Sequence, residues 1–197
     1  MTSTPVDGVI LAAGRSARME QPKALLTVGP DTFLERAAQT LRQAGCRRIW
    51  VVAGSDATWL DLAAGLGLEL VINAEPSSEQ VDSLRLVLRA LPPDTAGVLV
   101  LPVDLPLVQE QTATAMMAAF QAAPCTLVLP FHNTVAGHPV LLGSALFDEV
   151  LNTELEEGIR TLIMSHARDL CEVKVDDPGI LIDIDTPDDY SRSIEQQ

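Results

Sequence analysis

Three cations gather in one short segment near the start of the chain. Residues 9–23 read VILAAGRSARMEQPK, so an apolar run ends in two alanines and a glycine before Arg15, Arg18 and Lys23. Small residues let a backbone approach a ligand closely, and turn N–H groups together with Arg and Lys suit phosphate oxygens. We therefore expect this turn to bind a nucleoside triphosphate.

Two familiar phosphate-binding patterns are missing from this segment. The spacing G-x-G-x-x-G does not occur in it, which disfavours a dinucleotide site. The pattern G-x-x-x-x-G-K-[ST] is also absent, which excludes a Walker P-loop. The expected triphosphate site is therefore of another type.

Acidic residues stand where later strands are expected to end. Asp104 follows the apolar run 97–102, and Asp183 and Asp185 precede a predicted helix. Ligands bind beyond the carboxyl ends of strands in open α/β sheets, so these carboxylates should meet the opening turn at one sheet edge. Magnesium takes few carboxylates, several waters and substrate phosphates, so Asp104 and Asp185 are candidate ligands. Alternation along a strand would put Asp183 on the same face as Asp185. A structural role for all three aspartates, in a loop or at a helix N-terminus, stays open.

Alternating strands and helices must position these groups. Thr32 and Glu35 have capping-box spacing, and Gly45 marks a helix end. Thr186 followed by Pro187 predicts the start of the last helix. Before residue 124 we expect strands at 6–12, 48–53, 68–73 and 97–102, alternating with helices over 33–44, 56–66, 81–91 and 113–120. After it we expect strands at 126–129, 138–142, 171–175 and 180–184, with short helices over 144–151 and 157–166.

This alternation predicts βαβ units and an α/β fold, a single-domain three-layer sandwich with a mainly parallel twisted sheet. A hydrophobic content of 47% with 20% charged residues is typical of a globular chain with a substantial core. The 27 acidic residues outnumber the 13 basic ones, and the net charge of −14 argues against a nucleic-acid surface. No run reaches 18 apolar residues and residues 1–7 resemble no secretory signal, so we expect a cytoplasmic protein without a membrane span.

The three cysteines and one histidine carry weaker signals. Cys46, Cys125 and Cys171 are odd in number, far apart and without a C-x-x-C pair, which favours reduced core thiols over disulfides or zinc. His138 lies in a Gly-His-Pro turn, where a structural role is common. No Ser-His-Asp or Cys-His arrangement is legible in the sequence.

Several of these segments together resemble one family. They are residues 11–19 with Pro22-Lys23, and segments 101–106, 137–140, 158–160 and 183–189. From Gly8 to Tyr190 the chain is similar to the molybdenum cofactor nucleotidyltransferases, and in particular to their cytidylyltransferase branch. The resemblance implies a nucleoside-triphosphate-transferase fold of the glycosyltransferase-A type. It also implies one domain over 1–197, with a nucleotide-binding half at 6–123 and an acceptor-side half at 124–197.

The resemblance assigns roles to residues. Arg15, Lys23 and Asp104 would be catalytic, and Asp104 and Asp185 would hold Mg²⁺. The turn Gly137-His138-Pro139 would border the acceptor. The alanines at 12 and 13, in place of two glycines, resemble the branch that uses CTP rather than GTP. The nucleotide would contact Leu11, Ala12, Ala13, Gly14, Arg15, Ser16, Arg18, Lys23, Asn73 and Ser83.

The implied reaction transfers CMP from CTP to the phosphate of molybdopterin and releases pyrophosphate. Glu20, Glu79, Val81 and Val103 depart from the family pattern, so other uses stay open. One is transfer with another nucleoside triphosphate or to another acceptor, such as a sugar phosphate. Another is a non-catalytic protein that hands a cofactor nucleotide to a partner molybdoenzyme.

Overall fold

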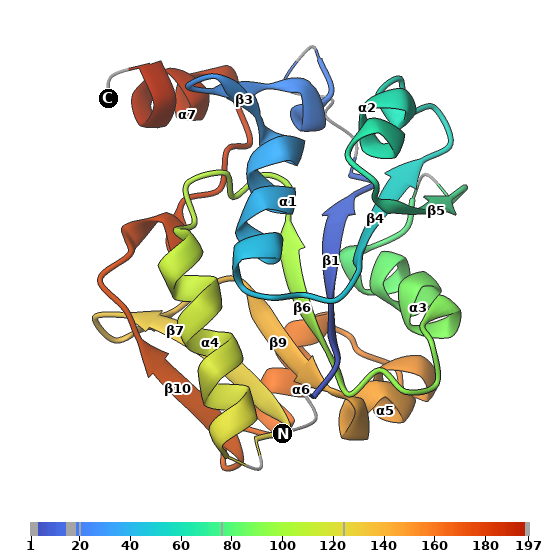
Figure 1. The fold of residues 1–197 in the computed structure, drawn as a ribbon, viewed down its shortest axis with the longest axis vertical. Helices are drawn as coiled ribbons and strands as arrows, with labels where there is room; N and C mark the ends of the chain where they lie inside the picture. Colours follow the sequence, from blue (N-terminus) through green and yellow to red (C-terminus); the bar gives the residue numbers. More distant parts are fainter. Residues whose placement is uncertain (1–3, 15–18, 20, 76, 124, 196–197) are drawn as a thin grey trace.

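A twisted sheet runs through the centre of the chain and carries helices on both faces (Figure 1). The computed structural model describes residues 4–14, 19, 21–75, 77–123 and 125–195. The strands are β1 (Val6–Ala12), β2 (Thr27–Val28), β3 (Asp31–Thr32), β4 (Ile49–Gly54), β5 (Glu69–Asn73), β6 (Gly97–Pro102), β7 (Leu127–His132), β8 (Val135–Ala136), β9 (Val140–Gly143) and β10 (Leu170–Lys174). The α-helices are α1 (Phe33–Gln43), α2 (Leu60–Gly65), α3 (Gln80–Ala90), α4 (Glu110–Ala122), α5 (Phe147–Asn152), α6 (Ile159–Ser165) and α7 (Pro187–Tyr190). Three 3-10 turns are η1 (Lys23–Leu25), η2 (Ser144–Leu146) and η3 (Pro178–Leu181), and η4 (Ser191–Glu195) is a π-helix.

The sheet is mixed but mainly parallel, as predicted. Within the described residues its order is β10-β7-β9-β6-β1-β4-β5, with β8 paired to β7. Strand β1 lies in parallel between β6 and β4, and β4 pairs in parallel with β5. Strand β9 runs antiparallel to both β6 and β7, where the regular βα rhythm stops. The carboxyl ends of β1, β4 and β6 therefore lie together at one edge.

Side-chain alternation along the central strands makes the three layers. Ile10 and Leu101 point to the face covered by α1 and α4, and both are almost fully buried. Val9 and Val100 point to the opposite face, which α3 and α5 cover. Both apolar clusters contain residues from before and after residue 124. None of the helices in the described ranges has the length and apolar character needed to cross a membrane.

The helix ends follow their sequence signals. Thr32 Oγ1 accepts from the Glu35 backbone N–H at 3.2 Å, and the Glu35 carboxylate accepts from the Thr32 N–H at 2.7 Å. Gly45 follows the end of α1 with φ +87°, a left-handed conformation that glycine adopts without strain. Thr186 and Asp189 make the same reciprocal cap at α7. The capping predictions are confirmed, whereas the helix predicted over 56–66 begins only at Leu60.

The strand predicted over 180–184 is wrong. Residues Pro178–Leu181 form the 3-10 turn η3 and the chain then continues without sheet pairing. The backbone N–H groups are used elsewhere, since Ile182 donates to the Gly179 carbonyl and Ile184 donates to the Asp104 carbonyl at 2.9 Å. The alternating apolar and acidic residues therefore belong to an irregular segment beside Asp104, outside the sheet, and not to a strand.

The expectation of three reduced thiols is also wrong. Cys125 and Cys171 form a disulfide, with their Cα atoms 6.0 Å apart, and Cys46 is free. Cys171 lies opposite Val128 in the parallel pairing of β10 with β7, which brings it next to Cys125 just before β7. A separation of 46 residues hides this neighbourhood in the sequence.

Candidate active site

The opening turn leaves β1 at the carboxyl edge of the sheet and lines a cavity of about 750 Å³. Leu11, Ala12, Ala13 and Gly14 contribute the wall on the β1 side, and Lys23 reaches it from η1. The volume suits a small-molecule ligand. Of the remaining residues predicted in this turn, Arg15, Ser16 and Arg18 lie outside the described part of the chain, as does Glu20, so their roles stay predictions.

Lys23 joins the two predicted metal ligands. Its Nζ donates to Asp104 Oδ2 at 3.0 Å and to Asp185 Oδ1 at 2.5 Å. The partners are 81 and 162 positions away in sequence. All three side chains are largely buried or half-buried. Sheet topology thus brings the predicted cation and both predicted carboxylates to one point.

Backbone bonds hold the two carboxylates at that point. The Val103 N–H donates to the Leu11 carbonyl at 3.0 Å, which fixes the turn after β6 beside the end of β1. The Asp104 carbonyl accepts from the Ile184 N–H at 2.9 Å, so the segment that carries Asp185 is tied to Asp104 itself. The backbone segments that carry the two carboxylates are therefore joined to β1 and to each other by bonds that do not involve Lys23.

The electrostatics keep Lys23 charged. Burial lowers the pKa of Lys23, but hydrogen bonds and charge from Asp185 and Asp104 outweigh burial and raise the pKa above its usual value. A protonated ammonium between two carboxylates offsets repulsion that would otherwise be costly at a partly buried site.

The donor set fits a divalent cation that is completed by substrate. Among the described residues no group of three or more His, Cys, Asp or Glu side chains is placed to hold a metal ion. Two carboxylates with waters and phosphate oxygens are nevertheless the usual surroundings of Mg²⁺ beside a nucleotide. Asp104 and Asp185 supply those two carboxylates, but only if Lys23 gives up its bonds to them.

The Gly-His-Pro turn lies beside the same edge. The His138–Pro139 peptide bond is cis, and the His138 N–H donates to the Ile180 carbonyl at 3.0 Å. A Cβ at Gly137 would overlap that carbonyl oxygen, so the close contact requires glycine. Burial lowers the pKa of His138, although charge from Asp104 and Asp183 partly opposes it. The imidazole is therefore neutral near pH 7.

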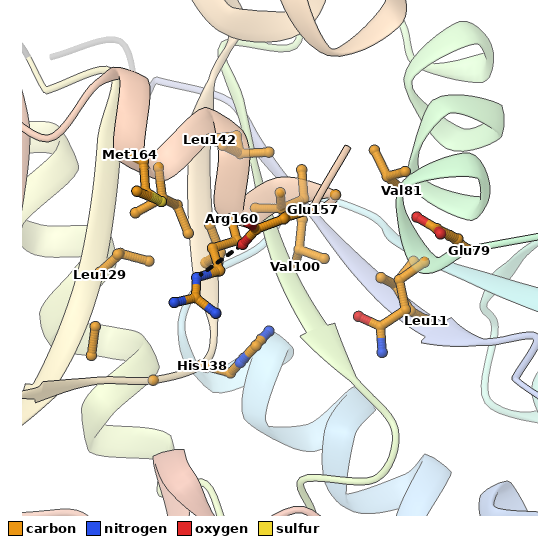
Figure 2. Close-up of a pocket in the computed structure, with 17 residues that line it drawn as sticks. Leu11, Glu79, Val81, Val100, Leu129, His138, Leu142, Glu157, Arg160 and Met164 are labelled. Atoms are coloured by element: carbon orange, nitrogen blue, oxygen red, sulfur yellow. Dashed lines mark ion pairs between the residues drawn. The ribbon is translucent and has the colours of Figure 1, made fainter. Parts of the chain in front are cut away.

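Figure 2 shows a second cavity of about 770 Å³. Leu11, Glu79 and Gln80 line both this cavity and the first. Gly137 and His138 line this second cavity, whereas Pro139 lines none of the three described here. Asp104, His138 and Asp183 line a third cavity of about 270 Å³, which shares lining residues with each of the first two. Asp183 lines this third cavity with Asp104 and His138, but it does not line the first cavity with Lys23 and Asp185, so the expected shared face of Asp183 and Asp185 is not observed.

Asn73 and Ser83 take different positions. Ser83 lines the first cavity, but Asn73 at the end of β5 is 6% exposed and does not line it. The Asn73 Nδ2 donates to Ser83 Oγ at 2.9 Å and to Ser78 Oγ at 2.8 Å. Asn73 therefore orients the serine next to the cavity, and its predicted contact with nucleotide stays a prediction.

Sequence reasoning missed several residues around the cavities. Gln80 lines all three of them from the first turn of α3. Asp56 and Trp59 line the first cavity just beyond the end of β4. The edge rule that identified Asp104 would also have found Asp56, because β4 is parallel to β1.

Asp177 was also missed, and no local signal indicates its role. It is 1% exposed and accepts from the Gln109 N–H at 2.9 Å, from Thr112 Oγ1 at 2.7 Å and from the Gly179 N–H at 3.0 Å. One carboxylate therefore caps α4 and shapes η3 beside the Gly137-His138-Pro139 turn.

Comparison with known proteins identifies the family. Residues 8–170 match the MobA-like NTP transferase domain. The chain belongs to the MobA-like NTP transferase family. It is thus a nucleotidyltransferase-family enzyme, in agreement with the resemblance found in its sequence.

Individual relatives of this MobA-like chain differ in nucleotide. The molybdenum cofactor cytidylyltransferase of Escherichia coli K12 is 25% identical over 97% of this chain and 96% of its own length. A molybdenum cofactor guanylyltransferase of Xanthomonas euvesicatoria is 33% identical, over 59% of this chain and 56% of its own length.

Solved structures agree with the fold. Rv0371c of Mycobacterium tuberculosis H37Rv has a TM-score of 0.84 and 28% identity, over 99% of this chain and 100% of that one. A structure of that protein in complex with manganese has a TM-score of 0.79 and 26% identity, over 98% and 100% of the two chains.

Proposed function

We propose that this MobA-like enzyme transfers CMP from CTP to the phosphate of a molybdopterin-type acceptor. The observation that carries the proposal is the Lys23–Asp104–Asp185 cluster in the lining of the cavity beside the opening turn. The full-length similarity to a cytidylyltransferase supports CTP, as do the alanines at positions 12 and 13. Residues 6–123 would bind the nucleotide, and residues 124–197 would bind the acceptor.

The bond changes are those of an in-line displacement. An oxygen of the acceptor phosphate forms a bond to the α-phosphorus of CTP. The bond from that phosphorus to the oxygen bridging to the β-phosphate breaks, and pyrophosphate leaves with the electron pair. The acceptor phosphate is already anionic near neutral pH, so the protein needs no strong general base and acts by alignment and charge neutralisation.

Asp104 and Asp185 would hold a divalent cation, Mg²⁺ in our proposal. Such a cation, when bound, neutralises phosphate charge and orients phosphate oxygens. The manganese complex of the related mycobacterial protein supports a divalent cation in this family. Lys23 would then exchange its carboxylate partners for triphosphate oxygens. Its positive charge would offset the negative charge of the departing pyrophosphate.

A pyrophosphate-release screen tests the proposal. The purified chain is mixed with CTP, GTP, ATP or UTP, with Mg²⁺ or Mn²⁺, and with molybdopterin or a sugar phosphate as acceptor. We expect the fastest release with CTP and molybdopterin. Faster release with GTP would favour guanylyl transfer, the second candidate that the Xanthomonas relative supports.

Two further outcomes would contradict the acceptor or the transfer itself. Faster pyrophosphate release with the sugar phosphate than with molybdopterin would show that a sugar phosphate is the acceptor. Nucleotide binding without pyrophosphate release under every condition would contradict transfer. That result would instead favour a protein that hands a cofactor nucleotide to a molybdoenzyme.

A further inference from the structure

The last helix of the chain lies next to the hairpin that follows Lys23. Helix α7 begins shortly after Asp185, and the β2–β3 hairpin begins shortly after η1, which carries Lys23. Figure 1 shows α7, in red, beside β3 of this hairpin, in blue. The two segments thus extend from the two partners of one ion pair, so their mutual position affects the contact between Lys23 and Asp185.

Tyr190, the last residue of α7, joins these segments. Its hydroxyl donates to the Thr27 carbonyl at 2.8 Å and lies 3.4 Å from Thr27 Oγ1. Its ring centroid is 6.1 Å from that of Phe33, which is fully buried at the start of α1. This separation is within the usual range for interacting aromatic rings. One side chain therefore holds α7 against both β2 and α1.

Asp185 lies between two anchors. On its amino-terminal side the Ile184 N–H donates to the Asp104 carbonyl. On its other side the cap made by Thr186 and Asp189 is internal to the start of α7, and none of the four residues of α7 is fully buried. Tyr190 is partly buried and packs against the first apolar cluster. The position of the Asp185 segment on this side therefore depends on Tyr190.

We infer that Tyr190 is a positioning residue for the divalent-cation site, which keeps Asp185 where the cation and the triphosphate require it. The inference rests on the proposed function, because that function assigns the cation to Asp104 and Asp185. Tyr190 lines none of the three cavities, so it acts through Asp185 and not by contact with substrate.

The bond from Tyr190 to Thr27 matters most when ligands are bound. The ion pair between Lys23 and Asp185 now joins the two segments directly, and it is given up when Lys23 turns to the triphosphate. The Tyr190 hydroxyl then still holds the Asp185 segment to the hairpin that follows Lys23. Without this hydroxyl, part of the binding free energy of the cation is used to order Asp185, and the observed affinity for the cation falls by that amount.

Mn²⁺ binding to the full chain in the presence of CTP tests the inference. Water-proton relaxation measures it, because Mn²⁺ in the slowly tumbling protein complex differs from Mn²⁺ on free CTP. Tyr190→Phe keeps the ring and removes only the hydroxyl. We expect this variant to bind Mn²⁺ about three- to tenfold more weakly than the wild type, the range that one lost hydrogen bond allows. Its affinity for CTP without metal, measured by calorimetry, should change less than about twofold.

Two further variants complete the experiment. Thr114→Val is the matched control, since the Thr114 hydroxyl also donates to a backbone carbonyl at an exposed position, that of Glu110 at 2.9 Å, and lines none of the three cavities. It should bind Mn²⁺ like the wild type. Tyr190→Leu removes the ring as well and should bind Mn²⁺ more weakly than Tyr190→Phe. If Tyr190→Leu does not fold, Tyr190→Phe alone decides.

The outcomes separate this inference from the proposed transfer. Equal Mn²⁺ affinity of folded Tyr190→Phe and the wild type would overturn the inference, even if CMP transfer is observed. Equal losses of Mn²⁺ affinity and of metal-free CTP affinity would also overturn it, because they would indicate a general structural role. No Mn²⁺ binding by the wild type would contradict the cation site and, with it, the inference. A selective loss of Mn²⁺ affinity, with no pyrophosphate release by the wild type, would uphold the role of Tyr190 and contradict the transfer.

Discussion

The ammonium of Lys23 lies 3.0 Å from the carboxylate of Asp104, and this ion pair joins the turn after β1 to the turn after β6. The two strands are parallel neighbours, so their carboxyl ends have to meet. Asp185 joins the same nitrogen from the segment before α7. A cation and two carboxylates from three distant segments thus form one electrostatic unit, from which the first three predictions follow.

Asp104→Asn should lower the rate of nucleotidyl transfer at least about hundredfold while the chain stays folded. The amide of asparagine keeps the shape of the carboxylate. It lacks the negative charge that, in our proposal, binds the divalent cation. Pyrophosphate release measures the rate, and circular dichroism measures the fold. Asp148→Asn, an exposed change on α5, is the control and should keep full activity. Unchanged turnover in folded Asp104→Asn protein would refute the role of this carboxylate.

Lys23→Ala should weaken CTP binding at least about tenfold, since a charged donor to the triphosphate is lost. Isothermal titration calorimetry with CTP measures the effect. Lys174→Ala on β10, where the side chain is exposed, is the matched control and should bind CTP normally. Equal CTP affinity in Lys23→Ala and the wild type would rule out the triphosphate role.

The same variant should melt at a lower temperature without ligand. Removal of Lys23 leaves Asp104 and Asp185 held together without their shared cation. Millimolar Mn²⁺ should restore much of the lost thermal stability if these carboxylates hold a divalent ion. No difference between the effect of Mn²⁺ on this variant and on Lys174→Ala would argue against that site.

Asp177→Asn should lower the free energy of unfolding by about 1–3 kcal/mol, because a buried acceptor becomes a donor that faces other donors. Its present partners are the N–H groups of Gln109 and Gly179 and the Thr112 hydroxyl. Urea denaturation measures the change. Asp176→Asn is the adjacent control, since that side chain is fully exposed. Equal stability of the two variants would show that the cap of α4 does not depend on Asp177.

Cys46 should stay unreactive at moderately alkaline pH. Burial, helped by the charge of Asp7, raises the pKa of this thiol to about 12. Its alkylation by iodoacetamide at pH 9 should therefore be at least about hundredfold slower in the folded chain than in urea, where an ordinary thiol is largely ionised. Rapid labelling of the folded protein at pH 9 would contradict the raised pKa.

The raised pKa of Cys46 also decides how the stability of the fold changes with pH. The unfolded chain loses the Cys46 proton first, at about pH 8.5, while the folded chain keeps it. The contribution of this thiol to stability is thus fully present below that pH and declines as the pH rises toward 12. Cys46→Ala should remove this part of the alkaline loss.

The first half of the chain was predictable because its local signals agree with its tertiary structure. The apolar runs at 6–12 and 97–102 form β1 and β6, and Thr32 caps the start of α1, as predicted. The rule that ligands bind at carboxyl ends then placed Lys23 with Asp104.

The later part was less predictable because its decisive bonds are long-range. The segment 180–184 has the alternation of a strand, but its N–H groups donate to Gly179 and Asp104. The Asp177 carboxylate caps a helix 68 positions earlier, and no pattern in a single sequence shows such a partner. The apolar wall of the second cavity likewise appears in the sequence only as ordinary core residues.

The bond between Cys125 and Cys171 makes one covalent ring of the chain between them. That ring contains the Gly137-His138 turn, α5, α6 and the hairpin tip at Asn133. A single backbone cut anywhere inside it leaves both new ends attached to the same molecule. The segment between the two cysteines can therefore be opened, for new termini or an inserted reporter, without separating it from the part of the chain that holds Lys23 and Asp104.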